Sequence, residues 1–227
     1  MNHHSKKRKY NKGFLNLDSR VWPGAVFLLV AFLFAWICCL CLPAILLAIA
    51  LLGHLLFFRD PPPKAPAGGE VISPGSGRVI SIDLVNEGRF LHNEAWKIRI
   101  FLALWNVHVT RSPMDGEIVY QEHTHGKHLN ALLKIASEYN ESNWIGIQRE
   151  NRKVLVRQMT GAIARHIYSD VFVGDQVLRG GKLGIICYGS GVEIYIPKRL
   201  FEPTVRVGDH VKVGMTPIGK WANEAAL

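Results

Sequence analysis

The sequence has few cysteines and lacks the local motifs of common cofactor and metal sites. None of its four cysteines has metal-ligand spacing with a histidine, and three of the four lie inside one apolar run. No disulfide framework is implied, which is typical of a reducing compartment. We interpret all four as small apolar packing residues. No phosphate loop, dinucleotide fingerprint or zinc spacing occurs, so no metal is expected. The cysteines are Cys38, Cys39, Cys41 and Cys187.

Formally charged side chains are missing from residues 24–58, a run of 35 residues. Soluble cores do not produce such runs, and a bilayer explains this one. A signal peptide would have a shorter apolar stretch and a small-residue cleavage site, so we expect a retained anchor. The sequence therefore predicts a membrane anchor over residues 21–58.

Pro43 divides this anchor into two parts. One continuous helix would be about 52 Å long, well beyond a hydrocarbon core of about 30 Å. Two alternatives remain: a helical hairpin broken near Pro43, or one spanning helix followed by an interfacial helix. Both flanks are basic, which favours the hairpin with both ends on the cytoplasmic side of the cell membrane.

Positive charge is concentrated at the N-terminus. The formal net charge is +9, and residues 1–20 carry +5 of it. A nucleic-acid surface needs basic residues spread over a folded face, so we expect no nucleic-acid partner. A basic tail of residues 1–20 next to an apolar run instead indicates a membrane surface.

The remaining chain is predicted to be mainly β. Residues 59–69 form a proline-rich linker, and residues 70–227 form one β domain. We expect a β-sandwich or flattened barrel with one short helix, Leu129–Tyr139, behind an N-terminal α-helical membrane hairpin. Strand patterns cover Val71–Ile82, Lys97–Val109, Glu117–Tyr120, Val154–Gln158, Ala162–Tyr168 and Gly184–Ile196.

Two pairs of similar turns suggest internal pseudo-symmetry. Residues 73–79 (SPGSGRV) resemble residues 112–118 (SPMDGEI), and residues 174–180 (GDQVLRG) resemble residues 208–214 (GDHVKVG). Each combines turn residues with a following strand. The copies are too few and too irregular for a solenoid. They fit a pseudo-symmetric sandwich, and the second pair also occurs in biotinyl- and lipoyl-carrier-like β folds.

Two groups of residues could carry chemistry. His123, His125 and His128 could form a metal tract, but without nearby acids we interpret them as solvated or hydrogen-bonded. His108 follows an apolar strand and shares a predicted strand face with Asn106, so a buried structural role and a proton-transfer role are equally open.

Six motifs occur together in one order, and together they resemble short, membrane-anchored phosphatidylserine decarboxylases from about Phe57 to the C-terminus. In this family a pyruvoyl group is made from the chain itself. In sequence order the motifs are Phe57-Phe58-Arg59-Asp60-Pro61, Ser73-Pro74-x-x-Gly77, Asn106-Val107-His108-Val109-x-Arg111-Ser112-Pro113, Lys134-x-Ala136-Ser137 with Asn140-Glu141-x-Asn143, Gln158-x-x-Gly161-x-x-Ala164-Arg165, and Tyr188-Gly189-Ser190.

The resemblance implies self-cleavage between Gly189 and Ser190, where the local sequence alone indicates an ordinary hairpin turn. Attack of the Ser190 hydroxyl on the Gly189 carbonyl, followed by β-elimination and hydrolysis, would leave a β chain of 1–189 and an α chain capped by pyruvoyl. The pyruvoyl carbonyl would form a Schiff base with the amine of phosphatidylserine while CO₂ leaves. His108 would transfer a proton, and Arg111 and Arg165 would bind the phosphate or carboxylate.

The resemblance also implies the partners, which are a phosphatidylserine substrate, a lipid bilayer and a second copy of the chain in a homodimer. It implies phosphatidylethanolamine as the product. The family has aspartate where this chain has Ser76, many members have aspartate at Asn106, and many short forms have arginine at Gly191. A non-processing lipid-binding scaffold or regulator is therefore the alternative. A tethered carrier would need a lysine at a hairpin tip, and its candidate turns contain only Lys212.

Overall fold

The structure is a computed structural model that describes residues 7–8, 14–130, 132, 135–161, 166–187 and 190–222. The chain divides into two compact units. One comprises Lys12–Pro62, and the other comprises Met1–Asn11 together with Pro63–Leu227. Each unit is described by itself.

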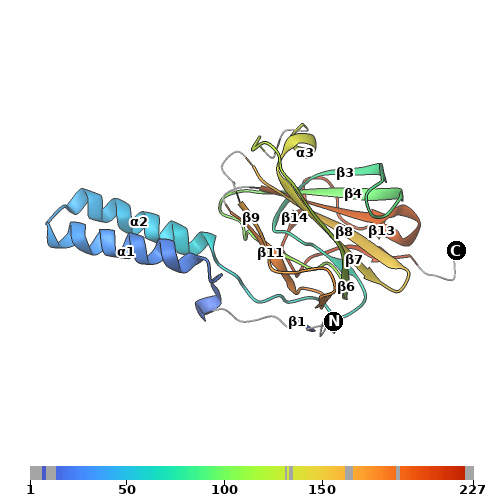
Figure 1. The fold of residues 1–227 in the computed structure, drawn as a ribbon, viewed down its shortest axis with the longest axis horizontal. Helices are drawn as coiled ribbons and strands as arrows, with labels where there is room; N and C mark the ends of the chain where they lie inside the picture. The colour runs from blue at the N-terminus through green and yellow to red at the C-terminus, as the bar shows by residue number, and fades with distance from the viewer. Residues whose placement is uncertain are drawn as a thin grey trace. The chain divides into compact units, whose positions relative to one another are not determined.

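The smaller unit is a pair of apolar helices. After a 3-10 turn, η1 (Phe14–Asn16), helix α1 (Val21–Ile37) and helix α2 (Cys41–Phe57) lie side by side (Figure 1). Each helix has 17 residues. Among the described residues, no helix combines the length and the apolar character needed to cross a membrane.

The predicted break near Pro43 is misplaced by a few residues. Cys39 adopts a left-handed conformation with φ of 57°, and the Leu40 N–H donates to the Ala35 carbonyl at 2.9 Å. This is the Schellman pattern that ends helices. Pro43 instead lies in the first turn of α2, where its missing N–H costs nothing. The cysteines of this turn are exposed rather than packed, whereas Cys187 is buried.

The larger unit is built from three sheets. In the nine-stranded sheet the strand order is β1-β10-β6-β7-β8-β12-β4-β3-β14, and the three-stranded sheets are β5-β11-β9 and β13-β15-β2. Except for the parallel pair of β1 and β10, neighbouring strands are antiparallel. The bounds are β1 Lys7–Arg8, β2 Val71–Ile72, β3 Gly77–Glu87, β4 Asn93–Leu102, β5 Val109–Arg111, β6 Gly116–Thr124, β7 Ser142–Arg149, β8 Arg152–Met159, β9 His166–Ser169, β10 Gln176–Val177, β11 Lys182–Cys187, β12 Ser190–Pro197, β13 Phe201–Pro203, β14 His210–Val211 and β15 Pro217–Trp221, with a 3-10 turn η2 at Lys198–Leu200.

The mainly β prediction is confirmed, but several elements differ from it. The predicted strands Val71–Ile82 and Lys97–Val109 are each split in two, and Gly184–Ile196 contains β11 and β12, on either side of the predicted turn. Strands β1, β7, β10, β13, β14 and β15 lie outside the predicted strand ranges. Helix α3 covers only Ala136–Tyr139, because Lys127 and Asn140 form a β-bridge that ends the helix and closes the preceding loop. Residues 131, 133 and 134 of the predicted helix lie outside the described residues, as do 162–165 of a predicted strand.

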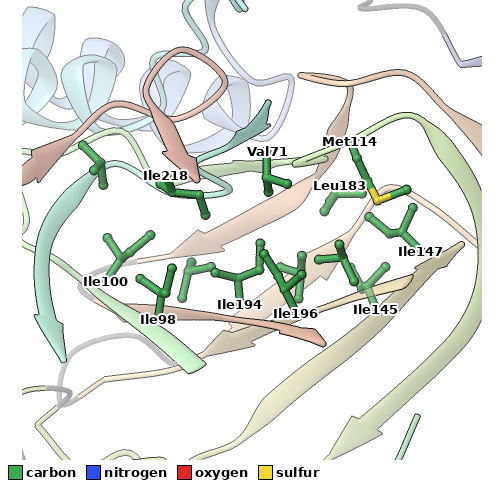
Figure 2. Packing of buried hydrophobic residues seen from close by; sticks show 14 of the residues in the cluster. Val71, Ile98, Ile100, Met114, Ile145, Ile147, Leu183, Ile194, Ile196 and Ile218 are labelled. Carbon is green, nitrogen blue, oxygen red and sulfur yellow. The ribbon is translucent and has the colours of Figure 1, made fainter. Parts of the chain in front are cut away.

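The core lies between the nine-stranded sheet and the two smaller ones. Isoleucines such as Ile98, Ile194 and Ile145 project from one face of the large sheet toward Val71 and Leu183 of the small sheets (Figure 2). All five side chains are fully buried. Alternation along each strand puts the neighbouring residues on the opposite face, which holds a smaller cluster around Trp144 and Tyr195.

The repeated turns are related by pseudo-two-fold symmetry, as the sequence predicted. The Ile72 N–H donates to the Pro113 carbonyl at 3.1 Å, and the Arg111 N–H donates to the Pro74 carbonyl at 3.0 Å. The second pair of turns matches equally well, since Gly174 donates to Ile118 as Gly208 donates to Val79, each at 2.8 Å.

The strand order shows how the two copies are connected. One copy is continuous and runs from β5 to β11, and the other consists of β2–β4 and β12–β15. The continuous copy is therefore inserted between β4 and β12 of the other. Where the continuous copy has a tight hairpin between β7 and β8, the interrupted copy has Leu102 paired with Ser190.

Candidate functional site

Ser190 begins β12 and faces the interior of the domain. It pairs with Leu102 of β4, and alternation places it on the same face as the core residue Val192. Its side chain is fully buried, and its Oγ has no hydrogen-bond partner among the described residues. A buried hydroxyl is normally hydrogen-bonded, so this oxygen needs an explanation, as does the equally unpartnered Oγ of Ser142. Gly189 and Tyr188 lie outside the described residues.

His108 is brought to the same end of the domain by the connection between β4 and β5. This segment turns at Asn106, whose side-chain oxygen accepts from the Ala103 N–H at 2.9 Å. His108 is fully buried, its Nδ1 lies 2.9 Å from the Asn106 carbonyl, and its own carbonyl accepts from the Ile186 N–H at 3.2 Å. The predicted shared strand face of Asn106 and His108 is wrong, because both residues lie in the loop before β5.

A buried polar chain crosses the space between the sheets beside His108. Asn143 donates to Gln158 at 2.7 Å, Gln158 donates to the Thr110 hydroxyl at 2.5 Å, and that hydroxyl lies 3.3 Å from the Gly184 carbonyl. All three side chains are buried. Asn143 and Gln158 were quoted in motifs without a role, and no spacing in the sequence links either one to Thr110.

The serine-proline turns place Ser76 close to the strand of Ser190. A Cβ added to Gly75 would lie 3.2 Å from Val192, so this turn packs directly on β12. The Ser76 hydroxyl accepts from the Val213 N–H at 2.9 Å. The symmetry-related Asp115 accepts from the Arg179 N–H at 2.8 Å. The hydroxyl therefore makes the backbone contact that a carboxylate makes in the other copy.

Arg111, one of the two arginines expected to bind substrate, is fully buried at the junction of the repeated turns. It donates to the Gly180 carbonyl at 2.9 Å, and its side chain packs beside Gly214. Arg111 therefore contacts residues of both copies, and its predicted role as a substrate ligand stays a prediction. Arg165, the other expected ligand, lies outside the described residues.

A cavity of about 440 Å³ opens next to the loop of His108. Phe101, Ala103, Trp105 and Asn106 line it from β4 and the following loop, and Arg78 lines it from β3. The walls are largely apolar, and the volume falls within the range of small-molecule sites. Trp105 is 76% exposed at the cavity rim.

On the opposite face of the large sheet, Glu193 is the centre of a buried ionic cluster. Its carboxylate lies 3.2 Å from Lys97 and from Arg157, 3.7 Å from Arg99, and accepts from the Tyr195 hydroxyl at 2.7 Å. Burial, and then the adjacent Glu193 charge, raise the pKa of Tyr195 well above its usual value. Burial lowers the pKa of Arg99 despite its carboxylate partner. The cluster connects β12 to both neighbouring strands.

The three histidines of the predicted solvated tract are brought together with an acid. His123 lies 3.0 Å and His128 lies 3.8 Å from the two carboxylate oxygens of Glu141. Ligand atoms of His123, His125 and Glu141 all lie within 4.8 Å of one another. The acid was missed because β6 and β7 are joined by a long loop, and their antiparallel pairing brings residue 141 back to residue 123.

The larger unit is a mainly β domain in which the buried Ser190 and His108 are the candidate functional residues. Comparison with known proteins identifies its family. A family model described as phosphatidylserine decarboxylase matches residues 54–219, and the chain belongs to this family of carboxy-lyases.

Several curated relatives are similar over most of their length. The phosphatidylserine decarboxylase proenzyme of Carboxydothermus hydrogenoformans is 40% identical over 93% of this chain and 95% of its own. The proenzyme of Nitrosomonas eutropha is 39% identical over 88% of this chain and 93% of its own. The proenzyme of Symbiobacterium thermophilum is 39% identical over 79% of this chain and 83% of its own.

Proposed function

We propose that this chain is a proenzyme that cleaves itself between Gly189 and Ser190 and then decarboxylates phosphatidylserine to phosphatidylethanolamine. The observation that carries this proposal is the buried Ser190 Oγ without a partner among the described residues. The family and the proenzyme names of the relatives support the same activity.

The cleavage is an acyl shift followed by an elimination. The Ser190 Oγ forms an ester with the Gly189 carbonyl while the Gly189–Ser190 amide C–N bond breaks and the hydroxyl proton moves to the released nitrogen. Loss of the Ser190 α-proton then breaks the Cβ–Oγ bond. Hydrolysis of the resulting dehydroalanine releases ammonia and leaves a pyruvoyl group at residue 190.

The surroundings of Ser190 fit such a group. The site is enclosed by the serine-proline turn and β4, and a pyruvoyl carbonyl withdraws electrons from a bound amine during loss of CO₂. His108 is the titratable side chain whose loop lies at this end of the domain, and we assign it the transfer of a proton to the decarboxylated carbon. The cavity next to Asn106 would accept the lipid head group, with Trp105 against the acyl chains. Arg111 and Arg165 are the proposed ligands of the phosphate or carboxylate.

The helical unit would hold the enzyme at the surface that contains its substrate. Many large apolar side chains of α1 and α2 are exposed, among them Phe27, Phe34, Trp36 and Leu46. Apolar surface of this extent indicates contact with lipid or another protein. We propose association with the cytoplasmic face of the cell membrane.

Intact mass of the protein purified from membranes tests the cleavage. We expect two fragments, residues 1–189 and 190–227, in the wild type and a single chain in Ser190→Ala. Ser142→Ala is the matched control, because Ser142 is also fully buried with an unpartnered Oγ but projects from the other face of the sheet. This control should be cut.

An uncut wild-type chain that releases CO₂ from phosphatidylserine would overturn the self-cleavage. A cut chain without that activity would overturn the substrate assignment, and an uncut, inactive chain that binds lipid would support the scaffold alternative.

A further inference from the structure

The cluster of His123, His125, His128 and Glu141 lies at the mouth of the loop between β6 and β7. His123 belongs to β6, and His125 follows it by two residues, so both imidazoles project from the same side of the chain. Glu141 immediately precedes β7. His123 and His125 lie at the start of this loop, Glu141 lies at its end, and His128 lies between them. A single ion bound by all four side chains would therefore close the loop.

The geometry of this cluster matches the requirements of a zinc-class ion. Zinc binds imidazole nitrogen and carboxylate oxygen at about 2.0–2.2 Å, so two ligands of one ion lie at most about 4.4 Å apart. The ligand atoms of His123, His125 and Glu141 lie within 4.8 Å, which requires shifts of well under 1 Å. The carboxylate is already 3.0 Å from His123.

His128 lies beside this three-ligand group and faces the same carboxylate. Its Nδ1 lies 3.2 Å from the Thr160 hydroxyl, and its Nε2 lies 3.8 Å from Glu141. Metal-binding histidines usually hold one ring nitrogen in such a hydrogen bond, which orients the other toward the ion. The Thr160 hydroxyl is positioned in turn by the carbonyls of Lys127 and Glu141, at 3.3 Å each.

We propose that His123, His125, His128 and Glu141 bind one divalent transition-metal ion of the zinc class. Three imidazole nitrogens and one carboxylate oxygen are ligands that zinc prefers, whereas magnesium and calcium prefer oxygen ligands alone. The ion links the ends of the loop that contains α3. Leu132 of this loop lines the cavity beside Asn106, so the ion holds one wall of that cavity in place.

The ligand side chains can be replaced without removing the backbone contacts of the loop. The Glu141 N–H donates to the Lys127 carbonyl, and the Glu141 carbonyl accepts from the Thr160 N–H. Neither contact involves the carboxylate, so Glu141→Gln tests ligation and leaves the fold intact. His166→Ala is the matched control, because His166 is an exposed strand histidine outside the cluster.

The experiment is a titration of tag-free, full-length protein with zinc after treatment with a chelator. His3→Ala/His4→Ala is the background for every variant, since adjacent histidines at the N-terminus could bind zinc on their own. We expect one equivalent to bind with micromolar or tighter affinity. We also expect a loss of at least tenfold in His123→Ala and Glu141→Gln, with no change in His166→Ala. Cobalt in place of zinc should give the absorption of a four-coordinate ion.

Two further measurements test whether the ion closes the loop. A hundredfold excess of zinc over its Kd should raise the Tm by about 5 °C or more, because the ion binds only the folded state. Amide exchange of residues 126–130 should slow on addition of zinc, while that of β4 should not change. Absence of saturable binding, or binding that both ligand variants retain in full, would overturn the site. Either result would leave the decarboxylase proposal untouched.

Discussion

Replacement of Glu193 by glutamine should cost this protein a large part of its stability. The carboxylate is fully buried and lies within 4 Å of Lys97, Arg99 and Arg157. Glutamine keeps the shape but removes the charge, so these cations lose their attraction to a buried carboxylate. Breaking a buried ion pair from one side typically costs about 3–5 kcal/mol.

Urea unfolding of the full chain in detergent, followed by tryptophan fluorescence, measures this loss. With an m value of about 2 kcal/mol/M, a loss of 4 kcal/mol lowers the midpoint by about 2 M. Glu202→Gln is the control, because Glu202 is an exposed strand glutamate, and its midpoint should move by less than about 0.3 M. A shift in Glu193→Gln as small as that of the control would refute the reasoning, since it would mean that the cations are stabilised without this carboxylate.

The same substitution probes how the proposed short fragment is retained. After a cut before Ser190, β12 would be the first strand of the fragment and would remain between β4 and β8. Buried side chains such as Ile194 and Phe201 contribute about 1.5–3 kcal/mol each to its retention. In cleaved Glu193→Gln the two fragments should separate at a lower urea concentration than in the cleaved wild type. Equal separation midpoints would show that the ionic cluster does not hold the fragment.

Three other substitutions test the turn and the outer face. Gly77→Ala should prevent folding or cost more than about 3 kcal/mol, measured by expression level and thermal unfolding, because a Cβ there would lie 1.9 Å from the Phe101 carbonyl oxygen. Ser76→Ala should cost about 1–3 kcal/mol in urea unfolding, since it leaves the buried Val213 N–H without its acceptor. Tyr195→Phe should flatten the alkaline part of the stability curve. The raised pKa keeps the folded phenol protonated, whereas the unfolded phenol begins to ionise at about pH 10. The stabilising contribution of Tyr195 is therefore complete below about pH 10 and is lost as the pH rises further. If Tyr195→Phe left the slope of unfolding free energy against pH unchanged above about pH 10, this would be contradicted.

Local sequence patterns predicted the type of fold better than the limits of its elements. Alternation identified most strands, but it could not show that Asn106 turns the chain between two of them, because that turn depends on a side-chain hydrogen bond to Ala103. Among the described residues of the predicted helix Leu129–Tyr139, only Ala136–Tyr139 are α-helical. Asn140 hydrogen-bonds to both the N–H and the carbonyl of Leu129, and periodicity does not reveal this contact between the two ends of the segment.

The candidate site was only partly predictable for a related reason. Ser190 and His108 were found through ordered motifs, whereas the acid near the histidine tract was missed, because residue 141 approaches residue 123 only through strand pairing. The sequence also could not show the burial of Arg111. The two copies of the turn close around its guanidinium, while its role as a substrate ligand stays a proposal.

The pseudo-symmetry gives a structural reason for a cut before Ser190. In the continuous copy, β7 and β8 are joined by a tight hairpin, and a cut there would free a strand end that the turn holds in register. At the equivalent place in the other copy, Leu102 and Ser190 pair directly although a whole copy separates them in sequence. Their register is set by pairing of β12 with both β4 and β8 rather than by a connecting turn. The pairing of β12 therefore does not depend on the bond before Ser190, and the proposed cut there would leave the strand in the sheet.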